Sequence, residues 1–335
     1  TSNESLRFYF DIVKDRLILA LKEAHNEPVF WEKFSNPRST GDLDSMQTLI
    51  EETFELSSPA PDFQAWRAEK LEAFARPRVA WAEDWIPPNI GWESEVAGFR
   101  VYWGQFDFFG KQKNTLVLPT FSEQYNYHEE QPWGMDALHV GQSGGLGGIT
   151  LYVDGTPYPV YSPEGKGDID WSKRLVGIDD TQVTVELVAE NVGPAEAPYT
   201  VRFTCSALAD RRDSPIQVVV EGGPADAAIE LGIGITRLPQ ETYALDTAAG
   251  VMGSWGVQGP DIGWIGLGVV FPPKRFLRAV GSELEHQVVI AAKAGEPVNY
   301  HIQGDWLRGR RFPRSPVLRN WMDDLRRTAN KAGLR

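Results

Sequence analysis

The fold class is decided by the stretch Tyr199-Thr-Val-Arg-Phe-Thr-Cys-Ser206. Large apolar residues alternate with polar ones along it, which is typical of a β-strand with one buried face. Similar short runs, rich in Val, Ile, Thr, Phe and Tyr and separated by Gly, Pro, Asp and Asn, lie on both sides of it. They are residues 96–103, 115–121, 148–153, 183–189, 216–221, 228–234, 262–271 and 287–292. No helical pattern interrupts them, so the sequence predicts a mainly β protein built as a β-sandwich rather than from alternating strands and helices.

The two ends of the chain have a different pattern. Apolar residues recur at three- and four-residue spacing in three segments of the N-terminal part, and again between residues 316 and 331. We therefore expect a helical N-terminal region, residues 1–77, and a β-sandwich domain, residues 78–335, that closes with a C-terminal helix.

The composition narrows the possible partners. The chain has 335 residues, a formal net charge of −13, 12 Trp and one Cys. An acidic chain repels phosphate backbones and anionic lipid, so we expect neither a nucleic-acid partner nor a membrane surface. Cys205 has no cysteine to pair with, and its place in the alternating stretch favours a buried structural thiol. The Trp excess indicates a well-filled core or indole faces that stack on flat ligands such as sugar rings.

Three polar segments are candidates for chemistry, and the first spans residues 83–103. It combines two indoles, two carboxylates and an arginine, namely Trp92, Trp103, Glu93, Glu95 and Arg100. In a strand that begins near Glu95, Arg100 and Tyr102 share one face. The arginine is either part of a structural ion pair on the sheet surface or held to meet a substrate carboxylate, which its planar fork suits.

The second segment, residues 123–148, is the densest polar cluster in the chain. Its candidate residues are Tyr125, Tyr127, His128, Trp133, Asp136, His139 and Gln142. Histidine exchanges protons near neutral pH, so both histidines are candidate bases, with a solvated loop as the other interpretation. No cofactor is predicted; a divalent metal held by His128, Asp136 and His139 stays an alternative, although the spacing matches no strong template.

The same segment ends in a Gly-rich run, residues 141–148. Such a run allows the backbone to approach a ligand closely. It lacks the Gly-Lys-Ser/Thr ending of a phosphate loop, and no β-α-β unit surrounds it. Gly141-Gln-Ser-Gly-Gly145 matches the letters of a nucleophile elbow but is not followed by a helix.

The third segment, residues 298–312, begins as a strand with one polar face. His301 lies on that face, and Trp306 lies in the loop predicted to follow. His301 is as compatible with an ordinary surface hydrogen bond as with a site. A glycosidase with paired carboxylates also stays open, because the chain offers the candidates Glu93, Glu95, Glu129 and Asp136.

Together these segments resemble DUF4861, a bacterial family associated with polysaccharide utilisation. The resemblance covers roughly residues 80–325 and rests on the motifs Trp92-Glu-Ser-Glu-Val-Ala-Gly-Phe-Arg-Val-Tyr102, Gly134-Met-Asp-Ala-Leu-His-Val-Gly-Gln-Ser-Gly-Gly-Leu-Gly-Gly148 and Val298-Asn-Tyr-His-Ile-Gln-Gly-Asp-Trp306. The family's usual Trp-Glu-Asn-Asp reads Trp92-Glu-Ser-Glu95 here. The resemblance implies a supersandwich like that of galactose mutarotase, a periplasmic or secreted setting, and a lyase or dehydratase that acts on uronic acid in polysaccharide degradation.

Elimination at a uronate needs a cation for the carboxylate, a base at C5 and an acid for the leaving oxygen. Arg100 is the predicted cation, His128 or His139 the base, and Tyr125 or Tyr127 the acid. The predicted contacts to an acidic oligosaccharide are Trp92, Glu93, Glu95, Trp103, Trp133, Asp136, Gln142, His301 and Trp306. Two alternatives remain, a glycoside hydrolase with paired carboxylates and a non-catalytic carbohydrate-binding protein.

Overall fold

The computed structural model describes residues 77–85, 89–123, 125–165, 167–224, 226–309 and 318–334. They belong to the unit that runs from Pro77 to Arg335. The predicted helical region, residues 1–77, lies outside the described residues except for Pro77. No helix in the described part is long and apolar enough to cross a membrane.

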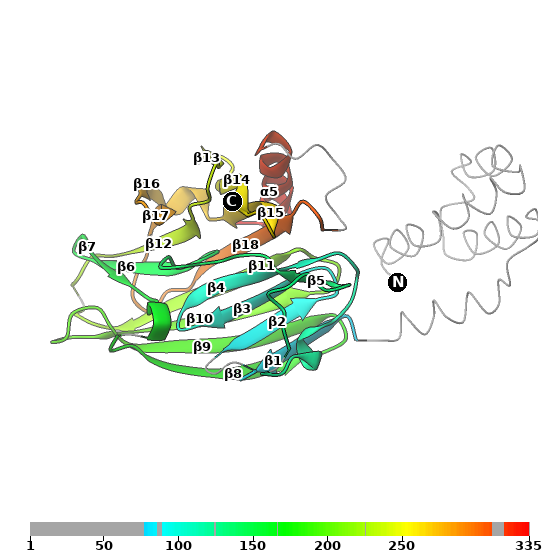
Figure 1. The fold of residues 1–335 in the computed structure, drawn as a ribbon. Coiled ribbons are helices and arrows are strands. Elements are labelled where there is room, and N and C mark those ends of the chain that lie inside the picture. Colours follow the sequence, from blue (N-terminus) through cyan, green and yellow to red (C-terminus); the bar gives the residue numbers. More distant parts are fainter. Residues whose placement is uncertain are drawn as a thin grey trace, which may run out of the picture. The chain divides into compact units, whose positions relative to one another are not determined.

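The strands form three antiparallel sheets, as Figure 1 shows. The N-terminal sheet has the order β1 (Val79–Glu83), β2 (Ile90–Ser94), β3 (Gly98–Tyr102), β4 (Gln105–Lys111) and β5 (Gly134–Asp136). The central sheet has the order β13 (Thr242–Asp246), β14 (Val251–Gly259), β15 (Gly263–Val270), β18 (Val298–Trp306), β11 (Asp213–Gly222), β10 (Tyr199–Leu208), β9 (Gln182–Val192) and β8 (Asp170–Ile178). The lateral sheet has the order β16 (Phe276–Gly281), β17 (Glu285–Ala291), β12 (Ile229–Thr236), β6 (Ile149–Val153) and β7 (Thr156–Pro159). The predicted mainly β sandwich is confirmed.

Short 3₁₀ helices interrupt three of the connections: η2 (Leu118–Thr120), η3 (Pro163–Gly165) and η4 (Pro273–Arg275). η2 lies where the sequence predicts a strand at residues 115–121, so that prediction is wrong. Pro119 cannot donate to a ladder, and the N–H groups of Val117 and Leu118 donate instead to the Glu93 carboxylate, at 2.7 and 2.8 Å.

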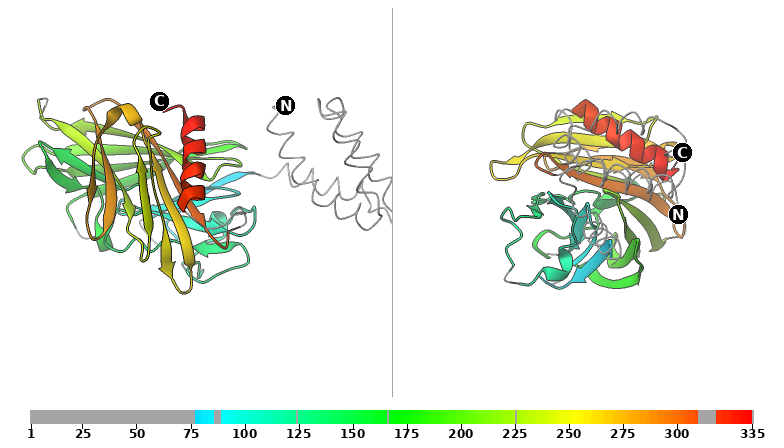
Figure 2. Two further views of the ribbon diagram at one scale, coloured as in Figure 1. Left: turned by 90° about the horizontal axis from the view of Figure 1, so that it is seen from above. Right: turned by 90° about the vertical axis from the view of Figure 1, so that its right-hand side faces the viewer.

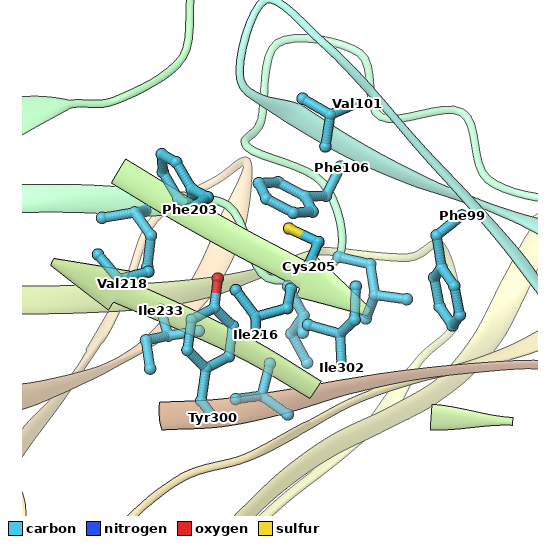
Figure 3. Close-up of a cluster of buried hydrophobic side chains, with 14 of the residues drawn as sticks. Phe99, Val101, Phe106, Phe203, Cys205, Ile216, Val218, Ile233, Tyr300 and Ile302 are labelled. Atoms are coloured by element: carbon cyan, nitrogen blue, oxygen red, sulfur yellow. The ribbon is translucent and has the colours of Figure 1, made fainter. Parts of the chain in front are cut away.

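The three sheets share one hydrophobic core. In β10, Tyr199, Val201, Phe203 and Cys205 are all buried, while the intervening residues are partly exposed, as the alternation predicts. Figure 3 shows where this strand's inward side chains meet the N-terminal sheet through Phe99, Val101 and Phe106, the lateral sheet through Ile233, and β18 through Tyr300 and Ile302. The expected structural thiol is confirmed, because Cys205 is free and fully buried, and burial raises its pKa.

The Gly-rich run joins two of the sheets. Phe106 N–H of β4 donates to Gly144 O (3.0 Å), and Gly147 N–H donates to Gly234 O of β12 (2.7 Å). Gly145 has φ +80°, and a Cβ there would lie 1.9 Å from Phe106 O. These glycines allow close packing of backbone against backbone, which is a structural role and not the predicted approach to a ligand.

The predicted C-terminal helix is present as α5 (Leu318–Ala332), which packs on the outer face of the central sheet over β14 and β15 (Figures 1 and 2). Trp321, Met322 and Leu325 form its buried side, and Trp321 Nε1 donates to Leu267 O at 3.0 Å. Burial of each such side chain contributes about 1.5–3 kcal/mol. The helix fits because the strands beneath carry glycine: a Cβ on Gly268 would lie 2.4 Å from Leu325 Cδ2.

Candidate functional site

The candidate site lies on the outer face of the N-terminal sheet, which points away from the shared core. Arg100 on β3 pairs directly with Asp107 on β4, and Phe109 pairs with Asp136 on β5. Their side chains point outward because Phe99, Val101, Phe106 and Phe108 occupy the inward positions. The covering loop, which we define as the connection between β4 and β5 (residues 112–133), packs aromatic rings over this face.

Arg100 is the centre of the cluster. Its Nη1 donates to Tyr127 OH at 2.7 Å, and its Nη2 donates to Asp136 Oδ2 at 3.0 Å and to Asp107 Oδ2. The guanidinium carbon lies 4.8, 5.5 and 5.1 Å from the ring centroids of Tyr102, Phe109 and Tyr127. With 5% of the residue exposed and two carboxylates already paired, Arg100 cannot also receive a substrate carboxylate. That predicted role is wrong, and Arg100 instead positions its neighbours.

The pKa values of the two carboxylates beside Arg100 shift in opposite directions. Burial opposes ionisation of Asp136, but Arg100 and the hydrogen bond from His128 outweigh it and lower the pKa of Asp136. Burial and the charge of Asp136 raise the pKa of Asp107 well above its ordinary value. Arg100 therefore favours the ionised form of Asp136, while burial and the neighbouring Asp136 charge disfavour the ionised form of Asp107.

His128 connects this buried cluster to solvent. Its Nδ1 lies 3.1 Å from Asp136 Oδ2, its ring centroid lies 4.4 Å from that of Tyr127, and 55% of its side chain is exposed. When Nδ1 carries the proton toward Asp136, Nε2 keeps its lone pair as an acceptor on a side chain that is more than half exposed. An imidazole held in one tautomer by a buried carboxylate can take a proton from a bound molecule and keep the resulting charge paired.

Tyr102 and Asp107 belong to the same cluster, although the sequence did not place either among the candidates. Tyr102 is partly exposed beside Arg100, and burial together with the charge of Asp107 raises its pKa, so its hydroxyl stays protonated. The signals were present: Tyr102 shares the Arg100 face by alternation, and Asp107 is a carboxylate inside the apolar run Phe106-Asp-Phe-Phe109.

The aromatic candidates of the covering loop pack around Arg100 and Phe109. Trp133 Nε1 donates to Tyr125 OH at 2.9 Å, and both residues belong to the cluster formed by Trp85, Phe109 and Tyr127. Tyr127 is buried, so it cannot donate a proton to a substrate as predicted. Trp103 is partly exposed at the β3–β4 turn, with a φ of +48° that is uncommon for a large residue.

Three candidates of the first segment have structural roles instead. Trp92 is fully buried in the shared core, and its Nε1 donates to Ser214 Oγ at 2.9 Å. Glu93 pairs with Lys111 under the covering loop, and Glu95 pairs with Arg78. Their predicted contacts to an oligosaccharide are therefore wrong, because all three side chains are buried and already have partners.

The remaining candidates lie apart from the cluster. His301 and Trp306 belong to β18, where His301 Nδ1 bonds Asp213 at 2.8 Å and Trp306 Nε1 donates to Ile262 O at 2.7 Å. Both are buried, so they do not form the predicted cleft wall. His139 and Gln142 are exposed, and His139 makes no hydrogen bond or ion pair with the described residues.

The metal alternative is not supported for the three residues that suggested it. Among the described residues, no group of three or more His, Cys, Asp or Glu side chains is arranged to hold a metal ion. His128 and Asp136 meet, but His139 does not join them.

Comparison with known proteins identifies the family. The sequence model of the family described as "Domain of unknown function (DUF4861)" matches residues 87–332. No curated protein matches the chain. A solved structure of a putative aldose 1-epimerase from Klebsiella pneumoniae subsp. pneumoniae MGH 78578 is 7% identical, with a TM-score of 0.35 over 72% of this chain and 83% of that one. A 4-alpha-glucanotransferase from Thermococcus litoralis is 9% identical, with a TM-score of 0.33 over 88% of this chain and 49% of that one, so this chain spans about half its length.

Neither of those structural likenesses is close enough to carry an argument about this chain. The family match is different in kind, because it covers well over half of the 335 residues. The chain belongs to the DUF4861 family.

Proposed function

We propose that the protein is a carbohydrate-active enzyme, a carbon–oxygen lyase that eliminates water or an alcohol from a uronate-containing oligosaccharide. The observation that carries the proposal is the half-exposed imidazole of His128, oriented through Nδ1 by the buried and ionised Asp136. Such a pair suits abstraction of a proton from carbon, which needs a base that is accessible and fixed in direction. The uronate substrate, the supersandwich ancestry and the periplasmic or secreted setting come from the family resemblance.

The proposed reaction assigns one proton to each of two side chains. His128 Nε2 takes the proton from C5, the C5–H electrons form the C4–C5 double bond, and the C4–O bond breaks. Tyr102 gives its proton to the departing oxygen, and the Arg100 guanidinium, 4.8 Å from the Tyr102 ring centroid, stabilises the tyrosinate that is left. Asp136 stabilises the imidazolium that forms, while Arg100 and Tyr127 hold Asp136 and the ring in place.

The cation for the substrate carboxylate is proposed to be Arg308 in place of Arg100. Arg308 pairs with Glu130, two residues after His128, and 39% of its side chain is exposed. Its Nη2 donates to Ile262 O at 2.9 Å and to Asp261 O, and its guanidinium lies 4.8 Å from the Trp306 ring centroid. A substrate carboxylate would bind this fork in place of Glu130.

The proposal is tested by incubating the full chain with uronate oligosaccharides. Elimination yields the ultraviolet absorbance of a C4–C5 double bond. New reducing ends without that absorbance would show hydrolysis, and binding without either product would show a non-catalytic carbohydrate-binding protein; both results contradict the proposal. Asp107 and Asp136 share Arg100 as their cation and both are buried, so paired-carboxylate hydrolysis at this cluster has less support.

Two matched pairs of variants test the proposed base and the proposed acid. His128→Ala should abolish elimination, whereas His139→Ala, the other candidate base, should keep it because it lies apart from Asp136. Tyr102→Phe should lower kcat by about 100-fold, the lower range for loss of a general acid. Tyr158→Phe, whose side chain lies on the core-facing side of β7, is its comparison. Full activity in His128→Ala would contradict the assigned base.

A further inference from the structure

The lateral sheet carries a pocket of about 170 Å³ on the face that points away from the core. Its floor consists of the buried side chains Thr150 and Tyr152 of β6 and Glu285 and Gln287 of β17, and Tyr161 lines it beyond β7. None of these residues belongs to the site described above.

The floor is flat because β12, which lies between these strands, has glycine where side chains would rise. A Cβ on Gly232 would lie 2.5 Å from Gln287 Oε1, and one on Gly234 would lie 3.0 Å from Glu285 Oε2. The two β17 side chains therefore extend over bare backbone. Glu285 and Gln287 are therefore mostly buried but still line the pocket. Side chains with a purely structural role would not need to face a pocket.

A continuous hydrogen-bond network fixes these groups. Glu285 Oε2 accepts from Gly144 N–H at 3.1 Å, while Oε1 accepts from Tyr161 OH at 3.2 Å and from the Gln287 amide. Tyr152 OH donates to Gln287 Oε1 at 3.0 Å. Both tyrosine hydrogens are thus directed into the network, which leaves the lone pairs of the two oxygens free to accept.

The pocket is consequently rich in acceptors and suits a ligand that donates. Besides the two tyrosine oxygens, the Glu285 carboxylate has about four acceptor sites, of which three are used. The described residues that line the pocket include no Lys, Arg or His. Arg278 lies 5.2 Å from the Tyr152 ring centroid but is paired with Glu230, so a carboxylate ligand would face Glu285 without a free counter-charge in the lining. Pro157 and Val280 add apolar surface to the walls.

We propose that this pocket is a second ligand site, which binds one neutral sugar ring. Hydroxyl groups supply the donors that the floor requires, and the C–H face of a pyranose suits apolar and aromatic walls. At roughly 30 Å³ for each water, the volume corresponds to about five or six waters, the size class of a single ring and not of an oligosaccharide. The proposed uronate site takes an anion, whereas this pocket takes a neutral ring. The pocket proposal does not depend on whether elimination occurs.

The test measures binding, so it does not depend on enzymatic activity. Methyl glycosides of glucose, galactose, xylose and rhamnose are titrated into the full chain by calorimetry, with glucuronate as the charged comparison. At the ligand efficiency of small ligands, at least one neutral glycoside should bind with a Kd of about 1 mM, and glucuronate at least tenfold more weakly. Tyr161→Phe and Glu285→Gln should each weaken that binding by about tenfold.

Two controls keep the test decisive. Glu283→Gln changes an exposed carboxylate two residues from Glu285 and should leave the affinity unchanged. Thermal unfolding of each variant shows whether it is folded, and Tyr161→Phe decides the result if Glu285→Gln is not. The proposal is overturned if no neutral glycoside binds, if glucuronate binds as well as they do, or if the affinity survives in the folded variants.

Discussion

His128 Nδ1 lies 3.1 Å from Asp136 Oδ2, and the histidine side chain of this pair is half-exposed while the aspartate is buried. The carboxylate is therefore shielded from water but bound to the imidazole on one side and to Arg100 on the other. A charge fixed in this way can orient the ring through Nδ1, which leaves Nε2 for the proton transfer that we propose.

Replacement of Asp136 should test that orientation. Asp136→Asn keeps the size of the side chain but removes the charge that pairs with an imidazolium, so elimination should slow by about 100-fold to 10,000-fold. Steady-state kinetics of the double-bond absorbance measure the change. Asp170→Asn on β8, which is exposed, should have no effect. Undiminished turnover in Asp136→Asn would show that His128 needs no buried carboxylate.

Arg100 should matter for stability more than an exposed arginine does. Arg100→Met leaves Asp136 buried without its main counter-charge, which costs about 3–5 kcal/mol of unfolding free energy for a buried pair. Arg174→Met removes an ion pair on β8 whose arginine is 62% exposed and should cost about 1 kcal/mol or less. Urea unfolding of the two variants measures both values, and equal losses would contradict the buried charge network.

Asp305 should make stability depend on pH. Burial raises its pKa to about 6 despite the Arg212 partner, from about 3.9 in the unfolded chain. Because the folded state then binds the proton more tightly, this group's contribution to stability is complete below about pH 4 and falls as the pH rises to about 6. The difference between the folded and unfolded pKa values of Asp305 corresponds to about 3 kcal/mol of unfolding free energy.

The measurement is the difference in unfolding free energy between the wild-type chain and Asp305→Asn across that range. The wild-type chain should lose stability relative to the variant as the pH rises from about 4 to 6. A difference that stays constant, or that changes in the opposite direction, would mean that Arg212 fully offsets the burial of Asp305.

Packing of α5 should be sensitive to a single methyl group. Gly268→Ala places a Cβ 2.4 Å from Leu325 Cδ2 and should destabilise the chain by about 1–3 kcal/mol through overpacking. Gly177→Ala on β8 meets nothing within 4 Å and should be neutral or slightly stabilising. Thermal unfolding compares them, and a neutral Gly268→Ala would show that the helix can shift on the sheet.

Much of the fold followed from periodicity, because half-buried strands such as β10 and the amphipathic α5 expose their pattern directly. Some strands without this alternation were not predicted from the sequence. β14, Val251-Met-Gly-Ser-Trp-Gly-Val-Gln-Gly259, has glycine at Gly253 where α5 packs on it and at Gly256 where Leu238 and Glu241 approach, which are tertiary causes that local patterns do not record. Residues 115–121 had strand composition but bond to Glu93 instead of a ladder.

The site was harder to predict because sequence proximity is not spatial proximity. His128, Asp136, Arg100 and Tyr127 do meet, since β3, β4 and β5 are neighbours and the covering loop folds back over them. Trp92 and Glu93 are closer to Arg100 in sequence than His128 is, but Trp92 points to the other face of the sheet and Glu93 is held by Lys111. Strand order and loop path, which decide these cases, depend on long-range pairing.

The glycine joint between the sheets also limits how this chain can change its length. Gly144 is bonded to β4 through its carbonyl and to Glu285 through its N–H, and Gly147 is bonded to β12 three residues later. One inserted residue would add about 3.3 Å of chain between these anchor points and reverse the facing of everything beyond it. A surface loop can absorb an insertion, but here it would move the cluster around Arg100 and His128 and the lateral pocket out of register with each other.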